Sequence, residues 1–386
     1  MSKSNSRREA AYILMRWQAL RENPAQLLND VHDIHFVQNL VYTVFRRMRT
    51  LRKILGKYLP KWPKGELECL LYVGAAQILY LDETPDFAAV YETVEAAKMC
   101  SNPSIPRVVN AVLRRLLREK EEVLKAIAAE PLEVRESFPT ALVKDWIARF
   151  GHENADKLAL YHNSPAETYL AYPDHFEKLP RGVAVRDVPG YAEGAFIVQD
   201  PATHHAIELM DVQKGERVLD LCAAPGGKTI QLAWQEAAVT ACEVNPKRRR
   251  VLEQNLKRVG KAENVAVIGE IPVKGNYSAV LVDAPCSNTG VLRRRPDARW
   301  NWSADKLQEL VRIQAELLER ATRLVQPGGR LVYSTCSNDR RENQDQVAAF
   351  LQKYPDWVLE KEVESLPFET GTDGAFVARL RAPKRG

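Results

Sequence analysis

Hydrophobic residues in the first third of the chain recur at the spacing of helices. Two stretches show a 3.6-residue period, namely Ala10, Ile13, Leu14 and Trp17, and then Leu40, Val41, Val44, Phe45 and Met48. Residues 67–81 are nearly all apolar, which predicts a helix buried on most of its sides. No strand pattern of convincing length interrupts these helices. The pattern therefore predicts an all-α domain over residues 1–128.

The next segment, residues 129–195, is mixed and weakly patterned. Residues 143–150 have helical spacing, whereas residues 168–172 and 183–188 are typical of short strands. This segment is predicted to be either a connector or a small α/β subdomain.

From about residue 196 the pattern alternates between strands and helices. Strands are predicted at 217–222, 238–243, 264–268, 278–283 and 330–335, and helices near 228–236, 246–259, 304–325 and 342–353. Such alternation predicts right-handed βαβ units and a mostly parallel, doubly wound, Rossmann-like sheet over residues 196–386. The last apolar stretches, 357–359 and 375–380, are predicted to add an antiparallel edge hairpin.

Length and composition fit a multidomain globular protein. The chain has 386 residues, 45% of them hydrophobic and 27% charged. No apolar run approaches the roughly 18 residues that span a bilayer, so a soluble cytoplasmic protein without membrane contact is expected. Six cysteines occur and none form a Cys-x-x-Cys pair, which predicts reduced thiols and no metal site.

Positive charge is concentrated at the amino end. Residues 1–60 contain eleven Lys and Arg against four acids, a balance of 11 − 4 = +7, whereas the whole chain carries +5. This asymmetry is typical of a polyanion contact and equally of a solvated helix face. Charge alone does not separate the two interpretations.

A glycine turn follows the first predicted strand of the alternating region. It reads Cys222-Ala223-Ala224-Pro225-Gly226-Gly227-Lys228-Thr229. Glycines allow a ligand to approach the main chain, and the helix that starts there favours negative charge. A phosphate loop would need glycine at position 222, and no G-x-G-x-x-G is present.

Acids follow the next two predicted strands. Glu243 lies about twenty residues beyond the turn, where a carboxylate accepts hydrogen bonds from ribose hydroxyls. Glu270 follows the third strand, at a position suited to an adenine edge. Each is alternatively a surface carboxylate. Ribose recognition without a pyrophosphate loop favours S-adenosylmethionine over NAD or ATP.

Two cysteines close strands that are predicted to be neighbours, about 4.8 Å apart. Cys286 ends 280–286 and Cys336 ends 331–336. Either thiol alone is more often a small buried hydrophobe. Together they suit cytosine methylation, because a thiolate that adds to C6 makes C5 nucleophilic. Asp283 is placed to act near N3, and a second thiol assists release of the product. These residues alone do not rank the two thiols.

The motifs resemble those of the RNA cytosine-C5 methyltransferases. The resemblance lies in 219–229 (LDLCAAPGGKT), in Asp283-Ala284-Pro285-Cys286-Ser287 with Thr289-Gly290, and in Ser334-Thr335-Cys336-Ser337. The amino half is similar to NusB-like RNA-binding domains at 39–42, 74–82 and 108–115. Together they are similar to the enzymes that methylate bacterial 16S ribosomal RNA, and the resemblance covers nearly the whole chain.

The resemblance implies site residues and a substrate. Cys336 becomes the nucleophile and Cys286 the thiol that assists release, with Asp283 and Lys228 beside the target base. The cofactor contacts implied for S-adenosylmethionine are Cys222, Ala223, Ala224, Pro225, Gly226, Gly227, Lys228, Glu243, Arg248, Glu270 and Asp283. The implied substrate is one cytosine of 16S ribosomal RNA, of the position-967 type, for a monomeric enzyme. A transfer-RNA methyltransferase and a non-catalytic RNA-binding assembly factor are the alternatives.

A segment rich in arginine and tryptophan follows the first thiol. Residues 291–302 contain Arg293, Arg294, Arg295 and Arg299 together with Trp300 and Trp302. Its place beside the predicted site favours phosphate contacts and base stacking. The alternative is a solvated loop whose tryptophans pack inward.

Overall fold

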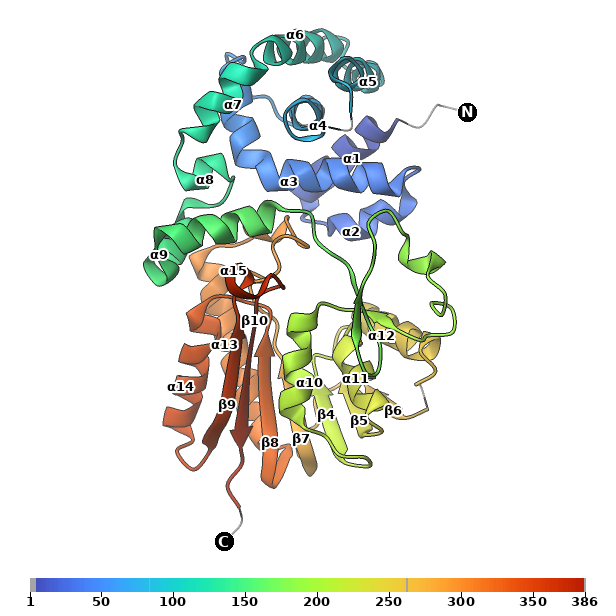
Figure 1. Ribbon diagram of the computed structural model, residues 1–386, viewed down its shortest axis with the longest axis vertical. Helices are drawn as coiled ribbons and strands as arrows, with labels where there is room; N and C mark the ends of the chain where they lie inside the picture. The colour runs from blue at the N-terminus through green and yellow to red at the C-terminus, as the bar shows by residue number, and fades with distance from the viewer. Residues whose placement is uncertain (1–4, 83, 262, 385–386) are drawn as a thin grey trace. The chain divides into compact units, whose positions relative to one another are not determined.

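The computed structural model describes residues 5–82, 84–261 and 263–384 and divides the chain into two compact units (Figure 1). One unit consists of Met1–Asn163 with Arg299–Asn301, and the other of Ser164–Ala298 with Trp302–Gly386. Three parts were expected from the sequence. The segment 129–195 is instead shared: its helices belong to the first unit, and its short strands belong to the second.

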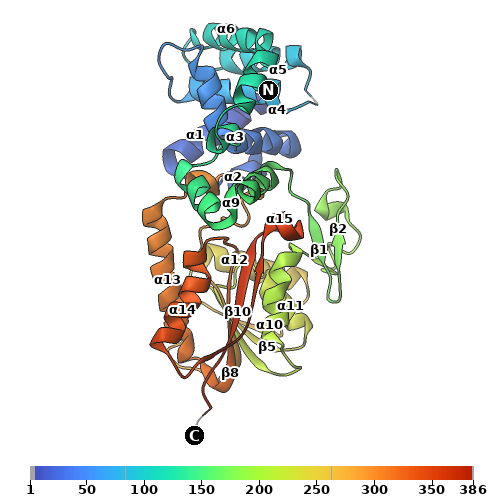
Figure 2. The ribbon, with the colours of Figure 1, turned by 60° about the vertical axis from the view of Figure 1, so that its left-hand side comes forward.

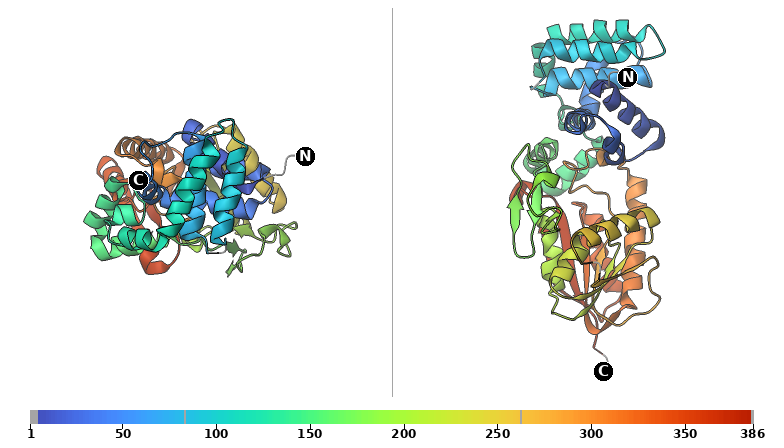
Figure 3. Two further views of the ribbon diagram at one scale, coloured as in Figure 1. Left: turned by 90° about the horizontal axis from the view of Figure 1, so that it is seen from above. Right: turned by 90° about the vertical axis from the view of Figure 1, so that its right-hand side faces the viewer.

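The first unit is helical throughout its described residues. Its helices are α1 (Ser6–Leu20), α2 (Pro24–Leu27), α3 (Ile34–Gly56), α4 (Glu66–Tyr80), α5 (Asp86–Lys98), α6 (Ile105–Arg118), α7 (Lys120–Ala128), α8 (Leu132–Arg135) and α9 (Thr140–Asn163), with a 3₁₀ turn, η1 (Leu28–Asp30). Helix α4 is buried along nearly its whole length, as its apolar sequence predicted, and forms the centre of this core. Helices α5 and α6 lie side by side (Figure 3).

Several basic side chains of residues 1–60 form ion pairs with acidic residues that lie later in the chain. Arg47 forms an ion pair with Glu136 at 2.8 Å, and Lys53 forms one with Glu130 at 2.7 Å. Arg49 donates to the Phe138 carbonyl. The charge balance of residues 1–60 therefore overstates the free positive charge of this unit, because the partners lie outside the counted segment.

A small sheet opens the second unit. It consists of β1 (Tyr169–Ala171), β2 (Phe176–Lys178) and β3 (Ile197–Val198) in the order β2-β1-β3. The strand predicted at 183–188 is wrong. Gly182 has φ 83°, and Val185–Asp187 form a 3₁₀ turn, η2, closed by the Asp187 amide on the Ala184 carbonyl. Alternating apolar residues there reflect a turn packed on Phe196.

The main sheet has seven strands in the order β6-β5-β4-β7-β8-β10-β9. The strands are β4 (Arg217–Leu221), β5 (Ala238–Cys242), β6 (Val265–Ile268), β7 (Tyr277–Asp283), β8 (Val325–Thr335), β9 (Val358–Ser365) and β10 (Ala375–Arg381). Strands β4 to β8 are parallel, and β10 is antiparallel to both β8 and β9. The predicted doubly wound sheet and the predicted antiparallel pair are both confirmed.

Helices cover both faces of this sheet (Figure 2). Residues of α10 (His205–Met210), α11 (Gly227–Trp234) and α12 (Pro246–Arg258) pack on one face with Val218, and those of α13 (Ala304–Thr322) and α14 (Gln344–Lys353) pack on the other with Leu219. Short elements complete the unit, namely α15 (Pro367–Thr370), η3 (Pro201–His204), η4 (Ala298–Trp300, which reaches into the first unit) and η5 (Arg340–Glu342).

The strand order reverses between β4 and β7, since the chain proceeds from β4 outward to β6 and then returns to β7. Ligands of open α/β sheets bind beyond the carboxyl ends of the strands at such a point. The glycine turn and both cysteines follow those strand ends. No helix within the described ranges combines the length and apolar character needed to cross a bilayer.

Candidate functional site

The glycine turn between β4 and α11 has an unusual backbone. Cys222 has φ 63° and Gly226 has φ 110°, both in the region that side chains disfavour. A Cβ added to Gly226 would lie 2.7 Å from Leu252 Cδ1, so glycine is required there by space as well as by conformation. The Ala223 amide donates to the Cys242 carbonyl at 3.0 Å, which fixes the turn to the end of β5.

Helix α12 supports the same turn from outside. Arg248 Nη2 donates to the Ala224 carbonyl at 2.7 Å, and Asn255 Nδ2 donates to the Pro225 carbonyl at 2.8 Å. Arg248 Nε also lies 3.4 Å from Glu243 Oε2. The predicted cofactor residue Arg248 thus links the turn to the acid that follows β5.

Glu243 is buried, with only 3% of its surface exposed. Its Oε1 accepts from the Asn245 amide at 2.9 Å, whereas its buried Oε2 has the ion-pair contact with Arg248 at 3.4 Å but accepts no hydrogen bond from the described residues. A buried carboxylate oxygen without a donor is costly, and a ligand hydroxyl would satisfy it. Glu270 follows β6 and is exposed.

Asp220 is a buried acid that the sequence did not single out. It is 0% exposed, and Thr229 Oγ1 donates to its Oδ2 at 2.5 Å. Burial raises the pKa of Asp220 to about 7, and the charge of Asp283 adds to this shift. Its signal in the sequence is a lone acid inside an apolar strand.

Lys228 and Asp283 form an ion pair across the switch point. The Lys228 Nζ lies 2.8 Å from Asp283 Oδ2, with side-chain exposures of 13% and 34%. Burial lowers the pKa of Lys228, but the charge and hydrogen bond of Asp283, with a further contribution from Cys336, raise it above its ordinary value. Lys228 is therefore a fixed cation between the glycine turn and the thiols.

The two cysteines approach each other closely. The Cys286 and Cys336 sulfurs lie 3.2 Å apart, and the Cys336 sulfur lies 3.4 Å from Asn288 Oδ1. Strands β7 and β8 are neighbours, as predicted, and Asp283 pairs with Ser334 in their register. The hydrogen bond with Cys336, together with burial, raises the pKa of Cys286 well above its ordinary value.

The loops that carry the cysteines are joined to each other. Gly290 donates its amide to the Cys336 carbonyl at 3.0 Å, and Asn338 donates its amide to Thr289 Oγ1 at 3.0 Å. Thr289 Oγ1 and Ser337 Oγ lie 2.9 Å apart. Sequence reasoning identified the thiols but missed this hydrogen-bond network, because small hydroxyl and amide side chains in loops carry no distinctive pattern.

The prediction that the arginines of residues 291–302 contact RNA is wrong for Arg293 and Arg299, which are buried, and Arg294 is engaged by acids of the protein itself. Arg294 pairs with Asp200 at 2.7 Å and with Asp373, and buried Arg293 lies 3.5 Å from Asp373. Their acidic partners are distant in sequence, so the local pattern resembled a free basic loop. Arg295 is the exposed member of the group.

Arg299 is fully buried in the helical unit. Its Nη1 donates to Asn163 Oδ1 at 2.9 Å, and its guanidinium lies over the Phe138 ring at 4.0 Å. Trp300 also packs there, and its Nε1 donates to the Phe45 carbonyl at 2.8 Å. Burial lowers the pKa of Arg299 well below its ordinary value. Both residues are structural parts of that core.

Comparisons with known proteins agree along the chain. Residues 207–381 match the family model described as 16S rRNA methyltransferase RsmB/F, and residues 4–118 match the NusB family. The "Ribosomal RNA small subunit methyltransferase B" of Cronobacter sakazakii is 32% identical over 90% of this chain and 90% of its own length. The protein of that name from Klebsiella pneumoniae is 34% identical over 92% of each chain.

Solved structures show the same fold. The crystal structure of PH0851 covers 98% of this chain and 99% of its own at a TM-score of 0.79 and 22% identity. A methyltransferase homologue from Pyrococcus horikoshii covers 65% of this chain and 97% of its own at a TM-score of 0.57 and 21% identity. By its 32–34% identity to the named relatives over at least 90% of its length, and by the matching family model, the chain belongs to the RsmB/F family of 16S rRNA methyltransferases and is an S-adenosylmethionine-dependent rRNA (cytosine-C5) methyltransferase.

Proposed function

We propose that this enzyme methylates one cytosine of 16S ribosomal RNA, of the position-967 type, through a covalent bond between Cys336 and C6 of the base. The observation that carries the proposal is the pair of sulfurs 3.2 Å apart at the switch point of the sheet. A methyltransferase acting on an already nucleophilic atom has no use for a thiol there, whereas C5 of cytosine requires one.

The other side chains of the site support a division of roles. Cys336 adds to C6, and Asp283 lies near N3, where the adduct gains electron density. The fixed charge of Lys228 holds Asp283 in place and interacts with Cys336. Cys286 assists removal of the C5 proton and expulsion of Cys336, because its sulfur contacts the nucleophile directly.

The residues around the glycine turn fit the methyl donor. S-adenosylmethionine supplies the methyl group for C5. We assign its ribose hydroxyls to the unsatisfied Oε2 of Glu243, and its main-chain contacts to 222–228. Arg248 supports the turn, Glu270 lies near the adenine edge, and Asp283 closes the site on the side of the thiols. The target base must be splayed from its helix to reach Cys336.

Methylation with labelled S-adenosylmethionine tests this proposal. Label is expected in 16S RNA and not in transfer RNA, and Cys336→Ala should abolish it. Cys286→Ala should leave a stalled covalent complex with RNA that survives denaturing electrophoresis. Label in transfer RNA would support the transfer-RNA alternative, and label in neither RNA would support an assembly factor. An exchange of phenotypes between the two variants would reverse the assigned roles.

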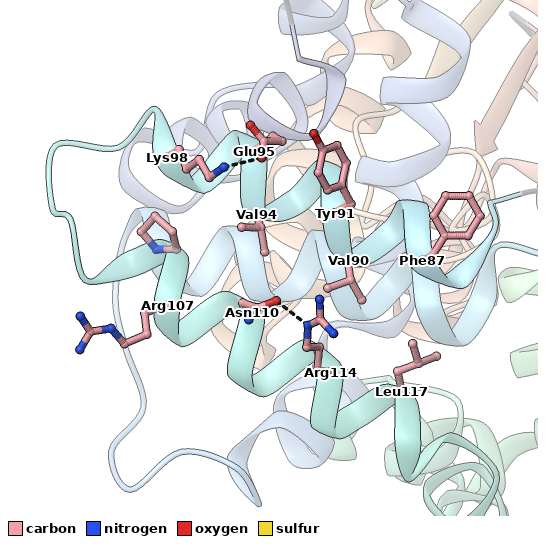
Figure 4. A pocket seen from close by; sticks show the side chains of 11 residues that line it. Phe87, Val90, Tyr91, Val94, Glu95, Lys98, Arg107, Asn110, Arg114 and Leu117 are labelled. Carbon is pink, nitrogen blue, oxygen red and sulfur yellow. Dashed lines mark hydrogen bonds and ion pairs between the residues drawn. The ribbon is translucent and has the colours of Figure 1, made fainter.

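A second part of the proposal concerns how the helical unit contacts RNA. A groove of about 490 Å³ runs between α5 and α6. Phe87 and Tyr91 of α5 are 76% and 60% exposed along it, although large aromatic side chains are usually buried. Figure 4 shows Phe87 and Tyr91 on α5, and Arg107 and Arg114 on the neighbouring α6.

The chemistry of this groove suits single-stranded RNA. Its lining contains the cations Lys98, Arg107 and Arg114 against one carboxylate, Glu95, which is already paired with Lys98. Exposed rings stack on unpaired bases, and arginines beside them contact the phosphates. We therefore propose that unpaired nucleotides flanking the target base bind between α5 and α6.

Steady-state kinetics tests the groove. Base stacking is worth about 1–3 kcal/mol per ring, so Phe87→Ala with Tyr91→Ala should raise the KM for RNA at least about tenfold at unchanged kcat. Tyr12→Ala removes a 50% exposed tyrosine of the same unit outside the groove and is the matched control. An equal KM for both variants would show that RNA does not use the groove.

A further inference from the structure

Glu342 is a carboxylate buried among the cysteine loops that the proposed chemistry does not use. It is 0% exposed. Its Oε1 accepts from the Ser287 amide at 2.9 Å and from Gln314 Nε2 at 3.0 Å, and its Oε2 accepts from the Ser287 and Ser337 hydroxyls at 2.5 Å. Four donors thus surround one side chain that can only accept while ionised.

These donors are the immediate neighbours of the thiols. Ser287 follows Cys286 and Ser337 follows Cys336, so one carboxylate holds the residue after each cysteine. Gln314 links Glu342 to the main chain before Cys286, because its Nε2 also donates to the Pro285 carbonyl at 3.0 Å. Glu342 therefore connects the loops after β7 and β8 by accepting hydrogen bonds from the hydroxyls of Ser287 and Ser337.

The main chain of the same segment is also fixed. Tyr333 Oη donates to the Glu342 carbonyl at 2.6 Å. Asn343 Oδ1 accepts from Thr335 Oγ1 at 2.6 Å, and its Nδ2 donates to the Ser337 carbonyl at 2.8 Å. Residues 342 and 343 thus bind the Cys336 loop on both sides of the sulfur, and the Glu342 side chain also bonds Ser287, the residue after Cys286.

A buried charge is an expensive way to join two loops. Burial raises the pKa of Glu342, while the hydrogen bonds from Ser287 and Ser337 oppose that shift. Neutral side chains or apolar packing would connect the loops at lower cost. The charge is useful where geometry matters, since four charge-assisted hydrogen bonds converge on one point.

We propose that Glu342 is a positioning residue that holds the two sulfurs at the separation needed for attack and release. This inference rests on the proposed roles of Cys336 and Cys286. Glu342 touches neither base nor methyl donor in this assignment. It acts on the thiols through Ser287 and Ser337, so its loss should impair the chemical step and leave binding of both substrates intact.

Kinetics of Glu342→Ala provides the first test. A displacement of 1 Å at reacting atoms costs about 10²-fold, so kcat should fall about 100-fold while both KM values stay within about threefold. In Glu342→Gln the amide oxygen still accepts from the Ser287 amide and from Gln314. The new amide nitrogen donates to the hydroxyls of Ser287 and Ser337, which then act as acceptors. This variant should recover kcat to within about tenfold of the wild type.

Disulfide formation gives a second readout that needs no RNA. Diamide accepts two electrons and two protons from the thiols, so two S–H bonds are replaced by one S–S bond and the diazene becomes a hydrazine. Sulfurs held 3.2 Å apart should couple quickly. In Glu342→Ala the rate should fall at least about tenfold, because the residues that directly follow the two cysteines lose their shared carboxylate, although Thr289 and Gly290 still link the loops farther from the sulfurs.

Glu216→Ala is the matched control. It removes a carboxylate of the same unit that is 24% exposed and paired with Arg330, just before β4 at the opposite end of the sheet. It should lower the melting temperature without changing kcat or the rate of disulfide formation. The inference is overturned if Glu342→Ala oxidises as fast as wild type, if Glu342→Gln is no better than Glu342→Ala, or if Glu216→Ala gives the same losses. Failure of the covalent mechanism would appear separately, as methylation by Cys336→Ala.

Discussion

Replacing Lys228 by methionine should destabilise the fold and stop methyl transfer for separable reasons. Lys228→Met keeps an unbranched side chain, one atom shorter, and removes the charge that pairs with Asp283 at 2.8 Å. Breaking a fully buried pair costs about 3–5 kcal/mol, but Asp283 is 34% exposed and water screens the charge left behind. We therefore expect a loss of about 2 kcal/mol in the free energy of unfolding.

The double variant Lys228→Met with Asp283→Asn separates stability from chemistry. With both charges removed, neither partner is left unpaired, so stability should recover by about 1–2 kcal/mol relative to the sum of the single variants. Methylation should stay at background, because the double variant still lacks the Asp283 carboxylate that acts near N3 of the base. Urea unfolding and labelled-methyl transfer measure the two quantities. If the stability losses of the two single variants simply add, the energetic coupling of Lys228 and Asp283 is refuted. If the double variant methylates RNA, the role assigned to Asp283 is refuted.

The pH dependence of this pair follows from the direction of the shift. The folded pKa of Lys228 lies above its ordinary value of 10.5, so the folded state binds the proton more tightly. The stabilisation is fully present below 10.5 and is lost only as pH rises through the folded pKa. The titration of Lys228 itself therefore adds no pH dependence to stability between pH 6 and pH 9.

Three further results are expected. Hydrogen peroxide should convert Cys286 and Cys336 to a disulfide, seen as a mass loss of about 2 Da, with activity restored by dithiothreitol; a sulfur shift of only about 1.1 Å is needed to reach bonding distance from 3.2 Å. Glu243→Gln should weaken S-adenosylmethionine binding about tenfold by calorimetry, whereas unchanged affinity would exclude Glu243 as the ribose acceptor. The folded pKa of Asp220, about 7, lies above its ordinary 3.8, so this acid favours the fold at low pH. Stability should fall by about 2 kcal/mol as pH rises from 5 to 8, and Asp220→Asn should flatten that dependence.

Sequence periodicity predicted the helical unit and the positions of the main strands well, because both depend on regular apolar spacing. The thiols and the glycine turn were found because their neighbours in sequence are distinctive. Glu342 was missed, because nothing near it in the chain indicates that Ser287 will donate to it. The ion pairs of Arg294 were missed for a related reason, since its partners Asp200 and Asp373 come from distant segments. Burial of charge through long-range pairing is invisible to local pattern.

The position of β10 makes the end of the chain part of the reaction centre's support. Strand β10 lies between β8 and β9 and pairs with β8 from Arg330 to Thr335, immediately before Cys336. A gene product truncated before residue 375 would keep every side chain assigned to methyl transfer, yet it would leave β8 as a bare sheet edge prone to self-association. A search for motifs alone would count such a fragment as a working enzyme, whereas the fold predicts an insoluble one.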